Sequence, residues 1–207
     1  MASVAARTMK THLIRIFCCL CLMGVVCSHA DSESRNWTFV AASTTDGTTW
    51  HGDRYAKCIP AGFSGTNGVT KIYRVGKDRD VLEHTYNWYT TQIYLSGASE
   101  KTSVVRFGGW NSGHEASTND LALAFYYDGR LLKSYSTLDI AGTPDNVSTS
   151  ISHYAWSGAI RGYGYIHSAS SDHLTYGFIL KTRDGRTLCF DVKTGELVRD
   201  WEPAFGN

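Results

Sequence analysis

The sequence contains little proline, and it contains little cysteine beyond its first thirty residues. Three of its 207 residues are proline and six are cysteine, four of which lie before position 28. The two later ones, Cys58 and Cys189, stand too far apart in the sequence to form a zinc motif. In an oxidising compartment we predict a disulfide between them, which would add about 4 to 5 kcal/mol by closing a long loop. The alternative is two unpaired thiols.

A strong excess of charge of either sign is also absent. The chain has 20 basic and 19 acidic residues, and without residues 1–30 the balance is 17 basic against 19 acidic, a net charge of −2. No run of basic residues occurs. Because phosphate groups and anionic lipids both attract basic patches, we expect neither nucleic acid nor a membrane surface as the partner.

A long apolar run occurs once, at residues 16–27, and it contains no charge. Arg7, Lys10 and Arg15 precede it, and Ser28-His29-Ala30 offers small residues at the two positions that a signal peptidase inspects. The run is shorter than the about 20 apolar residues that cross a membrane. We therefore predict that residues 1–30 are a cleaved signal peptide, the alternative being a retained anchor. Residues 31–207 would then be exported, without a transmembrane segment.

Apolar stripes at the helical period of 3.6 residues are scarce in residues 31–207, whereas alternation of apolar and other residues is common. In residues 121–127 we expect one face of a strand to carry Leu121, Leu123, Phe125 and Tyr127. Residues 188–192 alternate in the same way. Both patterns predict β-strands.

Three Asp-Gly pairs predict hairpins, because this pair supplies the positive φ that a two-residue turn requires. Asp128-Gly129 should join residues 121–127 to 130–135, and Asp184-Gly185 should join residues 174–182 to 186–192. A weaker third hairpin, at Asp46-Gly47, would pair residues 39–43 with 48–50.

The predicted fold is all-β, a single antiparallel β-sandwich or open barrel built from hairpins. Further strands are expected at residues 71–75, 81–86, 92–96, 103–107 and 164–167, and the length of residues 31–207 suits one domain. At most one short helix is expected, near residues 138–147, where Thr143-Pro144 resembles an N-cap followed by proline.

Two segments share a strand, Asp-Gly-Arg and strand order, at residues 128–132 and 184–188. The second continues as Asp191-Val192-Lys193-Thr194-Gly195-Glu196-Leu197-Val198, which resembles the hairpin endings of quinoprotein-type β-propeller blades. Residues 31–207 are too few for four blades and show no repeat of about 40 to 50 residues. Residues 128–198 also resemble uncharacterised exported bacterial all-β proteins, and this likeness implies no activity.

Histidines supply the candidate catalytic groups. His167, Asp172 and His173 lie in a polar stretch between two strands and could bind one metal ion, although such a stretch also suits a hairpin loop rich in turn formers. His114 and Glu115 could perform acid–base work, but neighbours on a strand point to opposite faces.

His153, the third candidate, could act as a base beside a serine. No Gly-x-Ser-x-Gly motif frames any serine, and a Ser-His-Asp site is assembled in space. The alternative is that Tyr154 and Trp156 pack on one face of a sheet while His153 is a structural hydrogen-bonding partner.

Aromatic side chains are the feature that bears most on binding. All 6 tryptophans and all 12 tyrosines lie in residues 31–207. Sandwiches that bind sugars present Trp and Tyr faces for stacking. In or beside predicted loops, where they could bind a ligand, lie Trp88-Tyr89, Trp110 and Tyr126-Tyr127, with Trp88, Trp110 and Tyr126 as the candidates. The alternative is that these rings fill the core, as aromatic residues do in β-sheets generally.

We therefore expect an exported, non-catalytic β-domain that acts as a binding or interaction module in the cell envelope or outside the cell. Its expected partner is a glycan or a protein surface, and no cofactor is expected. The alternative is an exported hydrolase, with or without a metal ion, that uses His114, His153 or the group of His167, Asp172 and His173.

Overall fold

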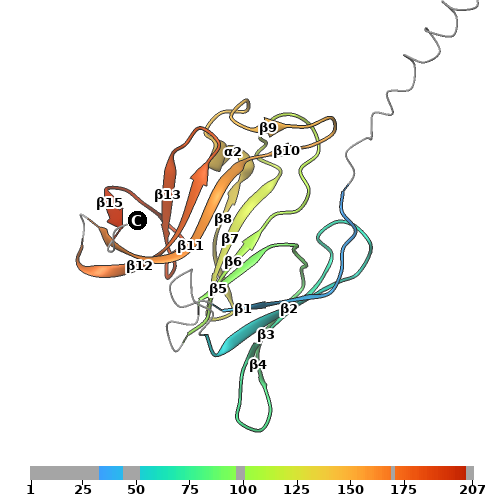
Figure 1. Ribbon diagram of the computed structural model, residues 1–207, viewed down its shortest axis with the longest axis vertical. Coiled ribbons are helices and arrows are strands. Elements are labelled where there is room, and N and C mark those ends of the chain that lie inside the picture. Colours follow the sequence, from blue (N-terminus) through green and yellow to red (C-terminus); the bar gives the residue numbers. More distant parts are fainter. Residues whose placement is uncertain (1–32, 44–51, 97–100, 169–170, 204–207) are drawn as a thin grey trace, which may run out of the picture. The chain divides into compact units, whose positions relative to one another are not determined.

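Antiparallel strands make up most of the computed structural model, which describes residues 33–43, 52–96, 101–168 and 171–203 (Figure 1). Within strands, the side chains of residues 165, 167, 168, 171–175 and 203 are outside this description. Asp31–Asn207 is one compact unit, distinct from Met1–Ala30, which is not described. The predicted all-β class is confirmed.

The strands form three larger sheets, which we call the N-terminal, middle and C-terminal sheets. The N-terminal sheet contains, in order, β1 (Phe39–Ala42), β2 (Arg54–Pro60), β3 (Gly68–Arg74) and β4 (Val81–Tyr86). The middle sheet contains β5 (Ile93–Ser96), β6 (Ser103–Phe107), β7 (Leu121–Tyr127) and β8 (Arg130–Ser136). The C-terminal sheet has the order β14 (Leu197–Val198), β13 (Thr187–Asp191), β12 (Ser171–Thr182), β11 (Ser157–Ser168) and β15 (Trp201–Pro203). A small ribbon pairs β9 (Ser148–Thr149) with β10 (Tyr154–Ala155).

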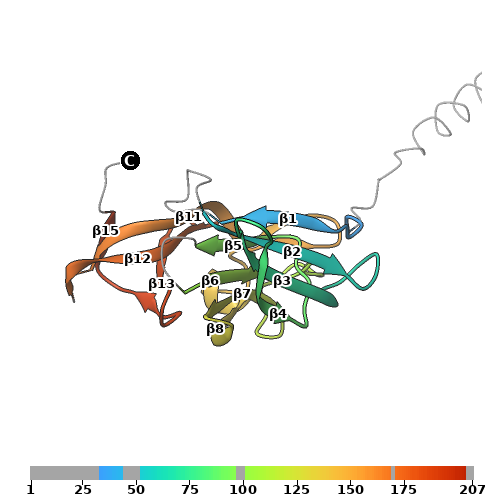
Figure 2. The ribbon, with the colours of Figure 1, turned by 90° about the horizontal axis from the view of Figure 1, so that it is seen from below.

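The middle sheet is covered on both faces, and Figures 1 and 2 both show it between the other two sheets. Val104, Ala124 and Tyr126 share one hydrophobic cluster with side chains of the N-terminal sheet. Val105 and Phe125 share the other with side chains of the C-terminal sheet. Alternate residues of β6 and β7 therefore enter different cores, which is why the two strands are buried along almost their whole length.

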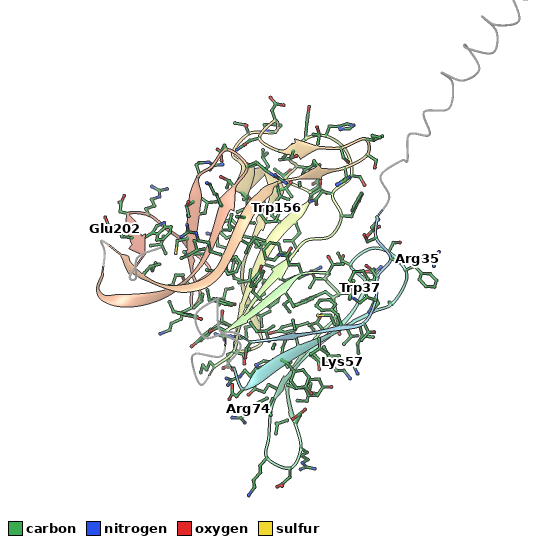
Figure 3. All side chains as sticks on the ribbon, in the orientation of Figure 1. Arg35, Trp37, Lys57, Arg74, Trp156 and Glu202 are labelled. Atoms are coloured by element: carbon green, nitrogen blue, oxygen red, sulfur yellow. The ribbon has the colours of Figure 1, made fainter. Side chains whose placement is uncertain are left out.

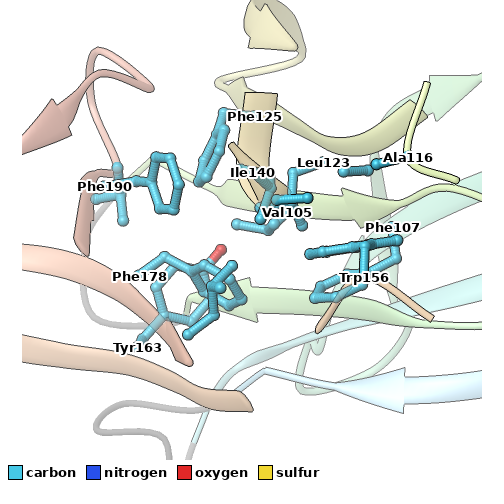
Figure 4. Packing of buried hydrophobic residues seen from close by; sticks show 14 of the residues in the cluster. Val105, Phe107, Ala116, Leu123, Phe125, Ile140, Trp156, Tyr163, Phe178 and Phe190 are labelled. Atoms are coloured by element: carbon cyan, nitrogen blue, oxygen red, sulfur yellow. The ribbon is translucent and has the colours of Figure 1, made fainter. Parts of the chain in front are cut away.

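Aromatic rings fill the core between the middle and C-terminal sheets (Figure 4). Phe178 of β12 packs edge-on against Phe125 and Tyr163, at centroid distances of 6.1 and 5.5 Å. Phe107 stacks on Trp156 at 5.8 Å. Edge-to-face and offset contacts of this kind stabilise a core beyond the area they bury.

The Asp-Gly turns follow two different geometries. The two-residue turn between β7 and β8 is confirmed, because Asp128 and Gly129 both have positive φ, 50° and 79°. At Asp184-Gly185 only Gly185 does, and the amide of Thr182 donates to the carbonyl of Arg186. The prediction of a two-residue turn there is wrong: three residues form the loop, and its last residue, a glycine, adopts the left-handed conformation.

Near the N-terminus, strand β1 pairs with β2, with Phe39 opposite Cys58. Residues 48–50, the predicted hairpin partner of residues 39–43, lie outside the described residues. The predicted turn at Asp46-Gly47 lies outside the described residues. Strand β2 was not predicted, because a charged residue, Arg54, occupies one of its inward positions and interrupts the apolar alternation.

The helix α2 (Thr137–Ala141) begins before the predicted N-cap. Ser136 caps it, and Asp139 completes a capping box by bonding back to the Ser136 amide. The guanidinium of Arg186 donates to the last carbonyls, at 3.0 and 2.7 Å. Pro144 lies in a turn after the helix. Across the described ranges, no helix is long and apolar enough to span a membrane.

The two cysteines, Cys58 and Cys189, lie in different parts of the fold. Both are free and buried in the structure, the arrangement of the alternative with two unpaired thiols. Cys58 belongs to the cluster between the N-terminal and middle sheets, whereas Cys189 packs with Ile166 and Ile179 in a separate cluster on the C-terminal sheet. Burial raises the pKa of Cys58 to about 11 and that of Cys189 to about 12.

A buried ion pair fixes β4 to β2. Arg54 is only 3% exposed, and its Nε donates to Glu83 at 2.9 Å. Thr102 donates to the same carboxylate at 2.8 Å, and Arg74 lies 3.3 Å from its other oxygen. Burial opposes ionisation of Glu83, but the hydrogen bonds from Arg54 and Thr102 and the two guanidinium charges outweigh it and lower its pKa.

The free thiols predict an alkylation pattern. In the folded chain at mildly alkaline pH, iodoacetamide should leave Cys58 and Cys189 unlabelled, because buried thiols with raised pKa values are poor nucleophiles. After unfolding without a reducing agent, both should label, as read by peptide mass spectrometry. A cross-linked peptide containing both residues would contradict this prediction.

The ion pair predicts a pH-dependent stability. Glu83→Gln should lower the free energy of unfolding by about 1.5 to 3 kcal/mol at neutral pH, as measured by urea titration. Because the Glu83 pKa is lowered in the folded state, its contribution is present above the unfolded value of about 4.3 and is lost as the pH falls through the folded value. The difference between wild type and variant should therefore vanish in acid.

The matched control is Asp53→Asn. Asp53 bonds to the same arginine, at 2.8 Å, but is 53% exposed. Exposed ion pairs contribute about 1 kcal/mol or less, so this variant should change stability little. Equal effects of the two substitutions would contradict the role assigned to Glu83.

Candidate functional site

A pocket of about 210 Å³ opens where four segments of the chain meet beside the N-terminal end of β1. Its walls come from residues 33–37, from residues 65–66 in the loop between β2 and β3, from residues 89–91 before β5 and from residues 109–110 after β6. Figure 3 shows Trp37, one of the lining residues, at this end of the N-terminal sheet. The pocket therefore joins the edge of the N-terminal sheet to the end of the middle sheet.

Hydrogen bonds fix the first wall to the β2–β3 loop. The backbone amide of Asn36 donates to the carbonyl of Phe63 at 2.8 Å, and its side-chain amide donates to the carbonyl of Gly65 at 2.8 Å. Glu33 accepts from the amide of Gly65 at 3.0 Å. Three bonds over five residues make this wall a fixed part of the fold.

Tyr89 links two of the segments that form the pocket by hydrogen bonds. Its amide donates to the carbonyl of Thr66 at 2.8 Å, and its hydroxyl donates to the carbonyl of Trp37 at 3.1 Å. The ring is fully buried, and burial raises its pKa, so the hydroxyl stays protonated and able to donate. Next to it, the Thr90 hydroxyl donates to the carbonyl of Phe107 at 2.9 Å, which ties this wall to β6.

Two tryptophans line the pocket. Trp37 is 57% exposed. Trp110 is half-buried, and its ring lies on the ring of His153 with 3.8 Å between centroids. The His153 ring is in turn hydrogen-bonded to the Ser150 hydroxyl, and the His153 backbone bridges to Ser112. This support restricts the orientations that the indole of Trp110 can adopt.

Polar groups at the pocket are few. The lining includes the hydroxyls of Ser34 and Thr91, which bond to no other group in the described part of the chain. Glu33 uses one carboxylate oxygen for Gly65. Apolar rings with a small number of polar groups are the usual composition of a site that binds a small molecule.

The predicted binding residues divide between pocket and core. Trp110 lines the pocket. Trp88 and Tyr126 are each 8% exposed, and both pack against Tyr86 with 4.9 Å between centroids. Both rings lie between the N-terminal and middle sheets, in agreement with the alternative that they fill the core. Neither ring is therefore exposed for stacking with a ligand.

The predicted catalytic residues do not converge in the described structure. His114 and Glu115 are exposed in the loop after β6, whereas His153 packs under Trp110. The side chains of His167, Asp172 and His173 lie outside the described residues, although their backbones belong to β11 and β12. Most of the polar stretch that was predicted as a loop therefore belongs to two long paired strands. Among described side chains, no three His, Cys, Asp or Glu residues gather as metal ligands would.

Sequence reasoning missed Trp37 and Asn36 as pocket residues, because both precede the first strand and carry no alternation signal. Tyr89, considered with Trp88 as a stacking residue, lines the pocket with a buried ring. The one available signal was a large aromatic residue in a polar segment, Glu33-Ser34-Arg35-Asn36-Trp37.

Comparison of the chain with protein-family models, with curated proteins and with solved structures finds no match.

Proposed function

We propose that this chain is an exported, non-catalytic β-domain that binds a glycan at the pocket between Trp37 and Trp110. The observation that carries the proposal is the pair of indole rings at one pocket, one largely exposed and the other seated on His153. The flat apolar face of a sugar ring stacks on an indole, while its hydroxyls bond to polar groups at the rim.

The size of the pocket favours a small ligand. Pockets for drug-sized molecules have volumes of about 300 to 1,000 Å³. At about 210 Å³ this pocket would hold one sugar ring of a larger glycan. The rest of the glycan would lie outside, where the exposed face of Trp37 can contact it.

The rigidity of the walls supports binding by a preformed site. Asn36, Tyr89 and Thr90 bond to backbone carbonyls from three different segments. A site that is ordered before the ligand arrives loses less conformational entropy on binding. Affinity would then come from ring stacking with little rearrangement of the protein.

The acidic groups at the pocket favour binding over hydrolysis. Glycosidases generally use a pair of carboxylates that flank the bond to be cleaved. Among the described residues that line the pocket, Glu33 is the one acid, and it already accepts a hydrogen bond from Gly65. The hydrolase alternative gains no specific support from this arrangement.

The binding proposal predicts the effect of removing an indole. Screening on a glycan array should identify a ligand, and Trp110→Ala or Trp37→Ala should weaken its affinity at least about tenfold, because aromatic anchors dominate binding energies. Titration calorimetry measures the change. Far-ultraviolet circular dichroism should show an intact β fold in both variants.

The matched control is Tyr73→Ala. Tyr73 stacks on Tyr55 at 5.1 Å on the N-terminal sheet, and neither residue lines the pocket. Its removal should leave glycan affinity unchanged. If Tyr73→Ala abolished glycan binding while Trp37→Ala and Trp110→Ala both retained it, the glycan would bind elsewhere and the proposed site would be refuted.

The export proposal predicts a defined mature N-terminus. When the full chain is expressed in a secreting host, the exported protein should begin at Asp31, as measured by intact mass and N-terminal sequencing, because Ser28-His29-Ala30 offers the cleavage signal. Recovery of the uncleaved chain from the cytosol would contradict it.

A further inference from the structure

Three buried polar atoms between the N-terminal and middle sheets have no hydrogen-bond partner among the residues that the structure describes. They are the hydroxyl of Tyr86, the indole nitrogen Nε1 of Trp88 and the guanidinium nitrogen Nε of Arg106. Tyr86 is 6% exposed, and Trp88 is almost as deeply buried. Leaving such a group unpaired costs about 1 to 3 kcal/mol, so buried polar atoms nearly always find a partner. Three in one region call for a common explanation.

The three residues belong to one cluster of side chains. The rings of Tyr86 and Trp88 stack with 4.9 Å between centroids and an angle of 20°. The Arg106 guanidinium carbon lies 4.8 Å from the centroid of the Trp88 ring. Trp88 therefore contacts both other members, although Tyr86 ends β4 and Arg106 lies on β6.

Among the described residues, Arg106 has no counterion, and its guanidinium lies against the ring of Trp88. A ring face compensates a cation only in part. The carboxylate of Asp128, whose charge reaches Tyr86, already faces Lys101 at 3.2 Å and His84 at 3.8 Å.

The chemistry of the unpaired atoms specifies the partner. Indole and guanidinium nitrogens only donate hydrogen bonds, and a tyrosine hydroxyl can also donate. A cation would be repelled by Arg106. We propose that Tyr86, Trp88 and Arg106 form a binding site for a small anion of the halide or carboxylate type, reached through the partly exposed Arg106. This site is independent of the glycan pocket.

An anion there would act on stability. Tyr86 belongs to the N-terminal sheet and Arg106 to the middle sheet, so a shared anion bonds one layer to the other. A ligand that binds only the folded state raises the melting temperature as its concentration rises. The ionic composition of the medium would then set how firmly the two sheets are held together.

The first experiment measures the melting temperature Tm of the full-length chain at constant ionic strength, with chloride replacing gluconate, which is too large for the site. Between about 1 mM and about 100 mM chloride, Tm should rise by about 3 °C or more. Formate in place of chloride distinguishes a carboxylate from a halide. If neither anion raises Tm above the gluconate value, the proposal is wrong.

Substitutions locate the effect. Tyr86→Phe should reduce the dependence of Tm on chloride or formate, and Arg106→Gln should abolish it, whereas Tyr126→Phe, in the same cluster, should keep it. With an empty site, Tyr86→Phe would leave Tm unchanged or raise it, because it removes an unpaired hydroxyl, and that result would overturn the proposal. A lower Tm without any anion dependence would also overturn it, in favour of a bound water.

Discussion

Burial of both faces of the middle sheet is the constraint from which the rest of the architecture follows. Antiparallel sheets commonly cover one face and expose the other, but Val104 and Val105, neighbours on β6, are both fully buried in different cores. Each face therefore needs its own covering sheet, and the chain supplies one from residues before β5 and one from residues after β10. Residues 89–91, which pass from the N-terminal sheet to the middle sheet, and residues 109–110, in the loop between β6 and β7, form walls of the pocket.

Local turn chemistry and alternation predicted much of this arrangement. The bounds of β4 and β6 agree with the expected strands, and the Asp128-Gly129 turn has the expected geometry. Strand β2 was hidden by its composition, and only part of β11, residues 164–167, was predicted. In β2 the inward positions hold Arg54, whose charge is neutralised by Glu83. In β11 the register shifts at bulges beside Ile160, so its side chains do not keep a strict period of two.

The candidate site was less predictable than the fold, because tertiary contacts decide which aromatic residues face solvent. The sequence places Trp88 and Trp110 in similar surroundings, each beside a predicted loop. The structure stacks Trp88 on Tyr86 in the core and seats Trp110 on His153 at the pocket. That difference depends on residues more than forty positions away from Trp110, and no local pattern reports it. The same holds for Cys58 and Cys189, since their burial in separate clusters is a property of the assembled layers.

The fixed wall at residues 33–37 has a consequence for the timing of activity. Only Asp31 and Ser32 separate Glu33 from Ala30. Under the proposed export and glycan binding, three peptide links, which span at most about 10 Å, would tie this wall to the leader until the leader is cleaved. Cleavage would then free the chain next to the proposed site, so maturation of the N-terminus and access of an extended ligand would be linked.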